Sequence, residues 1–153
     1  MSDLAIPGRL LPATPPAAME RVRALEAQVR ELPQVQIPTD HVIHAGLYAR
    51  TICIPAGVIL TGAEIACATL LVFDGHAAVT IGDAKQELAG RHVLPASAGR
   101  KQAFLALADT HLTMLFATEA TDVATAEAQF TTEPDTLMSR APDAINTITI
   151  TGD

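Results

Sequence analysis

The chain has 153 residues, enough for one domain with a substantial core and too few for two ordinary domains. Hydrophobic residues make up 49% of the sequence and charged residues only 18%, so the chain is too apolar to stay disordered. The net charge of −7 and the scarcity of aromatic residues argue against nucleic-acid binding, which needs a basic face and often stacking rings.

The sequence also bears on membrane association and on the two cysteines. No apolar run approaches the roughly 20 residues that span a bilayer, and residues 1–16 lack the charged-then-apolar order of a signal peptide. We therefore expect no membrane partner and a cytoplasmic site of folding or assembly. Cys53 and Cys67 lie in apolar runs without Cys-x-x-Cys spacing, which is typical of small buried hydrophobic residues.

Residues 1–40 are predicted to form a proline-rich arm followed by one amphipathic helix. Prolines crowd residues 1–16 and disfavour regular structure there. From 17 to 32, apolar residues recur at alternating steps of four and three and form one helical stripe: Ala18, Val22, Leu25, Val29 and Leu32. The stripe packs either on the chain's own barrel or against a second copy, and the pattern leaves both open.

Residues 41–119 are predicted to be all-β, because short apolar runs alternate with Gly, Pro and Asp breaks such as Asp74-Gly75. Seven or eight strands at this spacing favour a sandwich or barrel, and the lack of helical intervals disfavours a parallel α/β fold. The strands are expected at 47–54, 58–64, 68–73, 77–82, 92–96, 102–107 and 111–118.

Residues 120–153 are predicted to add a short helical extension and a terminal strand. The segment 121–130 has a capping residue and one apolar side, and 134–140 can form a further turn. The end of the chain alternates isoleucine and threonine, which gives a strand whose apolar edge carries Ile148 and Ile150. This strand can join its own sheet or that of a neighbour, and the sequence does not choose between them.

The turns of the β region carry a resemblance to a known family. Pro55-Ala-Gly57 and Asp74-Gly75 are spaced like the opening and closing turns of one strand-turn-strand motif, and Pro95 and Gly99 loosely match a second. Over residues 45 to 118 the chain resembles the cupin superfamily. This resemblance implies an all-β, antiparallel jelly-roll barrel, here with an N-terminal arm and helix and a helical C-terminal extension. It also implies one divalent metal held by three histidines and a glutamate.

The expected metal ligands are missing from both motifs. Ala63 and Ile65 stand where the paired histidines of the family would fall, the glutamate falls near Ala68 or Thr69, and Gln102 replaces the last histidine. Alanine and isoleucine cannot bind a metal, and one glutamine cannot replace three lost donors. We therefore expect a retained barrel with no metal and no other cofactor.

A narrower resemblance concerns phrases such as HVIHAGLYARTICIPAGVILTGAEI and DTHLTMLFAT. They are similar to cupin-like proteins of tailed bacteriophages and prophages. The resemblance implies a non-catalytic virion component, assembled in the bacterial host cytoplasm, that forms a homo-oligomer and binds other virion proteins through its terminal segments. The alternative is a metal-dependent cupin enzyme or a small-molecule-binding cupin.

Four histidines are weak candidates for metal ligands. His41 and His44 are three residues apart, so in an extended chain their imidazoles point to opposite faces, and local hydrogen bonding is favoured over metal binding. His92 and His111 each lie in a β run and could meet across a barrel, but they are typical of interior or rim histidines with ordinary partners.

Two groups of basic residues complete the candidates. Arg50 shares a strand face with Tyr48, and if that face is interior Arg50 needs an acidic or carbonyl partner. Structural pairing is favoured there over ligand binding. Arg91, Arg100 and Lys101 are close in sequence and predict a rim salt-bridge patch, with an anion or partner site as the alternative.

Overall fold

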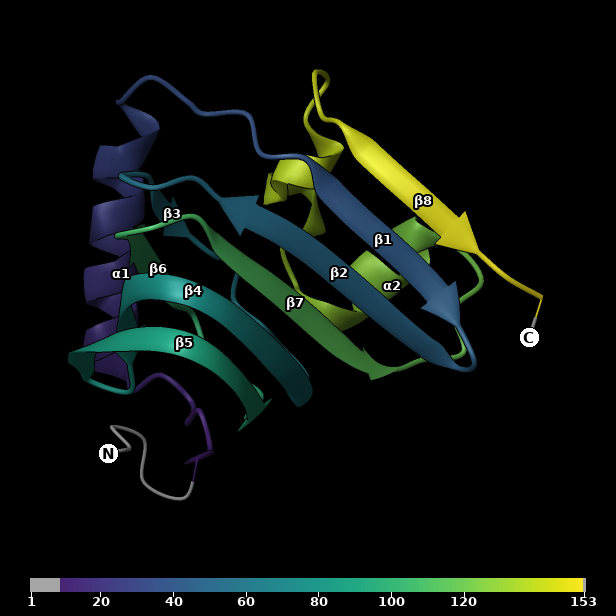
Figure 1. Ribbon diagram of the computed structural model, residues 1–153, viewed down its shortest axis with the longest axis horizontal. Coiled ribbons are helices and arrows are strands. Elements are labelled where there is room, and N and C mark those ends of the chain that lie inside the picture. The colour runs from purple at the N-terminus through teal and green to yellow at the C-terminus, as the bar shows by residue number, and fades with distance from the viewer. Residues whose placement is uncertain (1–8, 153) are drawn as a thin grey trace.

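The computed structural model describes residues 9–152, and within them it contains eight strands and two α-helices (Figure 1). The helices are α1 (Pro16–Arg30) and α2 (Val123–Phe130), and two single 3-10 turns, η2 (Pro134–Thr136) and η3 (Met138–Arg140), follow α2. The strands are β1 (Thr39–His44), β2 (Leu47–Ile54), β3 (Ile59–Thr61), β4 (Thr69–Ile81), β5 (Ala84–Ala96), β6 (Ala103–Ala106), β7 (Thr110–Ala117) and β8 (Asn146–Ile150).

All eight strands of the described residues belong to one curved sheet. Its order is β3-β6-β4-β7-β2-β1-β8, and β5 pairs with the free side of β4. Every pairing is antiparallel except that of β8, which runs parallel to β1 at the outer edge (Figure 1). The predicted fold class, an all-β jelly-roll barrel with a helix before it and a helical extension after it, is confirmed. The terminal strand joins the sheet of its own chain.

Strand β4 is the centre of the sheet because it changes partner along its length. Its first half pairs with β7, from Leu70 to Asp74, and its second half pairs with β6, from Ala77 to Val79. The predicted break between two strands at Asp74-Gly75 is therefore wrong, because β4 continues through both residues. The glycine marks the point where one long strand passes from one neighbour to the next. The run 84–91, which was not predicted as strand, forms the first half of β5.

The helices cover opposite parts of the sheet. The stripe of α1 packs beside β3 and buries Ala18 and Val22 within the same chain. Proline at the first position of α1 suits its start, and the helix ends at Arg30 shortly before Pro33. Helix α2 lies across β2 and β7, where Phe130 stacks on Tyr48.

The described part of the arm reaches the core through one residue, Leu11. Leu11 is buried, its carbonyl accepts from the Ser97 backbone N–H and its N–H donates to the carbonyl of Pro95 in β5. The remainder of the predicted arm, residues 1–8, lies outside the described residues. Among residues 9–152, neither α-helix has the length and apolar character that crossing a membrane requires.

We predict that Gly75→Ala destabilises the protein by about 2 kcal/mol or more, because the core would have to move to make room for a methyl group. A Cβ atom at Gly75 would lie 2.6 Å from the Cα of Thr110 and 2.5 Å from its Oγ1. The measurement is urea unfolding followed by circular dichroism. Gly62→Ala is the matched control, since a Cβ there meets only the Gln102 carbonyl oxygen at 3.6 Å. Equal unfolding midpoints for the two variants would contradict the prediction.

Candidate functional site

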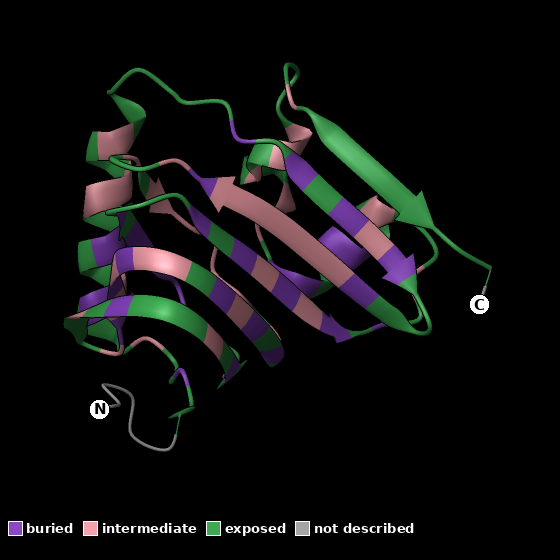
Figure 2. Ribbon diagram, in the orientation of Figure 1, coloured by how far each residue is buried: buried purple, intermediate pink, exposed green. Residues whose placement is uncertain are grey.

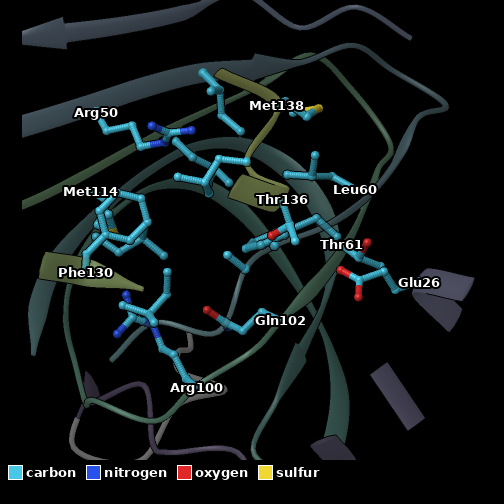
Figure 3. A pocket seen from close by; sticks show the side chains of 18 residues that line it. Glu26, Arg50, Leu60, Thr61, Arg100, Gln102, Met114, Phe130, Thr136 and Met138 are labelled. Carbon is cyan, nitrogen blue, oxygen red and sulfur yellow. The ribbon is translucent and has the colours of Figure 1, made fainter. Parts of the chain in front are cut away.

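The candidate site is a cavity of about 170 Å³ inside the barrel. Most of its lining is apolar and comes from the inward faces of the strands, from α2 and from the turns after it: Ile52, Leu60, Ile65, Leu71, Phe104, Leu112, Met114, Phe130, Leu137 and Met138. The polar side chains among them are few: Glu26, Arg50, Thr61, Arg100, Gln102 and Thr136 (Figure 3). An apolar cavity with a few polar groups is the usual form of a small-molecule site.

Glu127 neutralises Arg50 at one side of this cavity. Its buried carboxylate accepts from Arg50 Nη1 at 2.9 Å, from Arg140 Nε at 2.8 Å and from Ser139 Oγ at 2.5 Å. Burial raises the pKa of Glu127, but the hydrogen bonds from Ser139, Arg140 and Arg50 outweigh it, so the pKa is lowered overall. The acidic partner predicted for Arg50 is confirmed, and it comes from α2.

A series of hydrogen bonds connects Arg50 to the terminal strand. Arg50 donates to Tyr48 Oη at 3.3 Å, and Tyr48 Oη lies 2.7 Å from His41 Nδ1. His41 Nε2 lies 2.6 Å from Asn146 Oδ1, and Asn146 donates to the Ser139 carbonyl. Because Asn146 Oδ1 can only accept, His41 Nε2 carries the proton and Nδ1 accepts from the tyrosine. Burial and the nearby Arg50 lower the pKa of His41, which keeps the imidazole neutral.

A second ion pair fixes α1 to the barrel. The Lys101 side chain is fully buried, and its ammonium donates to Glu26 at 2.9 Å and to the Gly62 carbonyl at 2.7 Å. Glu26 is the acid that lines the cavity, so its charge is already neutralised by Lys101. The pair joins a helix to the loop before β6 and closes one wall of the cavity.

Arg100 is the cation of the cavity that lacks an acidic partner. Its residue is only 2% exposed, and its guanidinium donates to the Ser97 carbonyl at 2.7 Å and to Thr69 Oγ1 at 2.6 Å. None of the ion pairs within residues 9–152 involves Arg100. Burial lowers the pKa of Arg100 to about 10, so the group is still charged at neutral pH. Cys67 lies nearby, but burial raises the pKa of its thiol, which stays neutral.

The predicted rim salt-bridge patch is therefore wrong for two of its three residues. Arg91 is exposed on β5, but Arg100 and Lys101 are buried. The reason is that the segment 97–102 folds inward as it enters β6, with the Gly99 N–H bonded to the Ile65 carbonyl. The proximity of the three basic residues in sequence did not indicate that the segment 97–102 folds into the interior.

The residues of the cavity do not fit the metal that the resemblance implies. Ala63, Ile65 and Gln102, the positions at which the resemblance implies metal ligands, line the cavity, and Gln102 donates its amide to the Thr80 carbonyl at 3.0 Å. Within residues 9–152, no three His, Cys, Asp or Glu side chains are grouped closely enough to hold a metal ion. We derive no chemistry from a metal at this position.

The four candidate histidines are not brought together. His41 is buried and His44 is exposed, in agreement with the opposite faces expected from their spacing. His92 on β5 bonds the Ala89 carbonyl and packs edge-on against Phe73, and His111 is exposed on β7 opposite Asp74. Each has a local structural role or faces outward.

The candidate interaction residues fall into two groups. Ala18 and Val22 are buried against the same chain, and Leu25 and Val29 are half-buried. Leu32, Ile148 and Ile150 are exposed, the last two on an edge strand whose residues are all exposed (Figure 2). Whether these residues contact another chain stays a prediction.

Sequence reasoning missed Glu127, Asn146 and Ser139. One signal was available for Glu127, because it occupies the same helical face as Val123, Ala126 and Phe130, and an acid in an apolar stripe needs a cationic partner. No comparable signal marked Asn146 or Ser139, whose roles depend on how the C-terminal segment returns to β1.

Solved structures share the general fold of the chain. A cupin superfamily protein from Desulfitobacterium hafniense is 14% identical with a TM-score of 0.45, and the match covers 60% of this chain and 87% of that one. KdgF from Halomonas sp. is 19% identical with a TM-score of 0.45, covering 57% and 86%. A salicylate 1,2-dioxygenase from Pseudoaminobacter salicylatoxidans is 13% identical with a TM-score of 0.45, covering 65% of this chain and 32% of its own. No family model and no curated protein matches the sequence.

These neighbours correct one expectation. The chain was expected not to be an enzyme because the expected metal ligands are missing, and this expectation is corrected, since the solved structures of similar fold include a salicylate 1,2-dioxygenase. At identities of 13 to 19% the shared fold assigns no reaction to this chain.

We predict that Glu127→Gln lowers the stability at pH 7 by roughly 2–4 kcal/mol, because two arginines lose a buried anionic partner. The folded-state pKa of Glu127 lies below the ordinary 4.5, so its contribution is complete above about pH 4.5 and is lost as the pH falls through the lower, folded value. The variant should therefore show a smaller loss of stability than the native chain over that acidic range, measured by urea unfolding at several pH values.

Asp135→Asn is the control for this prediction. Asp135 pairs with the same Arg140 at 3.2 Å, but its side chain is 96% exposed, so its removal should change little. Identical acid dependence in the native chain and in Glu127→Gln would show that the Glu127 carboxylate is not the group that titrates.

Proposed function

We propose that the protein binds one small organic molecule inside its barrel, with the cavity between β2, β6, β7 and α2 as the binding site. The observation that supports this best is the cavity of about 170 Å³, with its apolar walls and a few polar groups. An engineered cavity of about 150 Å³ with similar apolar walls binds benzene, so a ligand with a body of that size fits. The proposal assigns no reaction.

The surroundings of the cavity favour a preformed site. Arg50 and Glu26, the two cavity-lining charges that have partners, are held by Glu127 and Lys101 respectively, which are themselves almost fully buried. Side chains fixed in this way lose little freedom when a ligand enters, which reduces the entropic cost of binding. Thr136 and Met138 on the 3-10 turns after α2 are exposed and form the outer part of the lining.

Methionine methyl groups report on this site, because Met114 and Met138 line the cavity and Met19 on α1 does not. We expect small aromatic or branched aliphatic compounds of about 6–10 heavy atoms to shift the NMR methyl signals of Met114 and Met138 and to leave that of Met19 in place. Ala63→Phe fills the cavity and should abolish these shifts.

The control for Ala63→Phe is Ala66→Phe, three residues away at an exposed position outside the lining. Circular dichroism verifies that both variants keep their β structure. The proposal fails if no compound moves the Met114 signal, or if Ala63→Phe responds as strongly as the native chain.

A second function, assembly with other copies or other virion proteins, is favoured by the edge of β8. All of β8 is exposed, its outer side has no neighbouring strand among the described residues, and Ile148 and Ile150 are 53% and 47% exposed. An uncharged, apolar edge is a surface on which further strands can pair. We propose the bacteriophage particle as its setting on the sequence resemblance alone.

We predict that the paired substitution Ile148→Lys and Ile150→Lys lowers the mass of the protein in solution, because charges on an edge strand oppose pairing. The measurement is light scattering after size-exclusion chromatography at matched concentrations. Val93→Lys is the control, since Val93 is similarly exposed, at 46%, but lies on β5 outside the predicted interaction residues. A native chain of monomer mass, or an unchanged mass in the paired variant, would contradict assembly through β8.

A further inference from the structure

Arg100 brings one more positive charge into the cavity than the chain neutralises. Arg50 is paired with Glu127, and Glu26 is paired with Lys101. The guanidinium of Arg100 is bonded only to a hydroxyl and a carbonyl, both uncharged. Burying an uncompensated cation is costly, and a ligand of opposite charge removes that cost.

We propose that the ligand of the cavity is a small organic acid whose single carboxylate pairs with Arg100 and whose apolar body lies between the barrel strands and α2. This inference rests on the proposed function and adds the chemical class of the ligand. It concerns binding and assigns no reaction.

The guanidinium of Arg100 has unused N–H donors that could bind such a ligand. A guanidinium carries five N–H donors, and the hydrogen bonds described above use one on each of the two terminal nitrogens of Arg100. The same bonds hold the group by its neighbours Ser97 and Thr69, so its orientation is fixed before a ligand arrives. Figure 3 shows Arg100 and Gln102 reaching into the cavity from the same side, with Arg50 across from them. A planar carboxylate matches such a fork in a bidentate pair.

The charges around the cavity favour a ligand with only one carboxylate. Arg100 is the single uncompensated cation of the described lining, so a second carboxylate on the ligand would find no unpaired cation there. The amide nitrogen of Gln102 is used by the Thr80 carbonyl, which leaves the amide oxygen as an acceptor. A hydroxyl on the ligand is the natural partner for that oxygen.

The walls favour an organic acid over an inorganic anion. Leu112, Met114 and Phe130 offer no hydrogen bonds to the remaining oxygens of a phosphate or sulfate. A benzoate-sized molecule would place its carboxylate at Arg100 and its ring against these side chains, burying apolar area as well as one charge.

The test compares matched acids and amides on the full native chain by calorimetry and by the Met114 methyl shift: propionate with propionamide, benzoate with benzamide, and phenylacetate with phenylacetamide. We expect at least one acid to bind about tenfold or more tightly than its amide, because a charge-assisted pair is replaced by a neutral contact. Inorganic phosphate should bind more weakly than that acid.

Variants test the assignment to Arg100. Arg100→Met should remove the preference for the acid over the amide, and Arg100→Lys should keep part of it because the charge remains. Arg91→Gln, which changes an exposed arginine of β5 outside the lining, should leave binding unchanged. Circular dichroism and unfolding verify that the variants fold, and the acid–amide comparison on the native chain does not depend on them.

The outcomes separate this inference from the proposed function. If amides bind as tightly as acids, or if phosphate binds as tightly as the best acid, the organic-acid class is wrong and the small-molecule site stands. A preference for acids that survives in Arg100→Met would move the anion site away from Arg100. If neither acids nor amides bind, both the inference and the site are refuted.

Discussion

The carboxylate of Glu127 is the constraint on which the arrangement of the cavity depends. Arg50 projects from β2 toward the barrel interior, and without a partner it would be a half-buried charge beside Phe130 and Met114. Glu127 supplies that partner from α2 and holds the same helix against Arg140 of η3. A single buried acid therefore ties the sheet, the helix and the 3-10 turns into one unit that covers the cavity.

The same acid determines which cation is left for a ligand. Glu127 already accepts hydrogen bonds from two arginines and a serine, and it makes no ion pair with Arg100. Lys101 is likewise held by Glu26. The chain thus neutralises Arg50 and Lys101 and leaves Arg100 to be compensated by something bound. A stable barrel and a charged site coexist because the stabilising ion pairs and the unpaired arginine are separate groups.

The sequence was sufficient for most of the fold. The strand at 47–54, the helix near 17–32 and the helix near 121–130 were all predictable, because their apolar periodicity and turn residues are local signals. The continuous β4 was not predictable, because a glycine in sequence indicates the end of a strand. In the structure, Gly75 lies within the strand and leaves room for Thr110 of β7. The parallel pairing of β8 with β1 likewise depends on contacts between the two ends of the chain.

The site was harder to predict than the fold, and for a physical reason. Ala63, Ile65 and Gln102 were singled out from the resemblance as the positions where metal ligands would be expected, and the structure places these residues in the cavity. The partner of Arg50 could be anticipated as an acid but not located, because Glu127 is 77 residues away in sequence. Arg100 and Lys101 are adjacent in sequence, yet one is paired with an acid and the other is not, and only the tertiary structure distinguishes them.

Arg50 and Arg100 are proposed to have different roles, one structural and one for a ligand. NMR of the arginine side chains, labelled at Nε and Cζ, tests this directly while benzoate is added to the native chain. We expect the Arg100 signals to shift in proportion to the ligand bound and the Arg50 signals, fixed by Glu127, to change far less. Shifts confined to Arg50, with Arg100 unaffected, would contradict it.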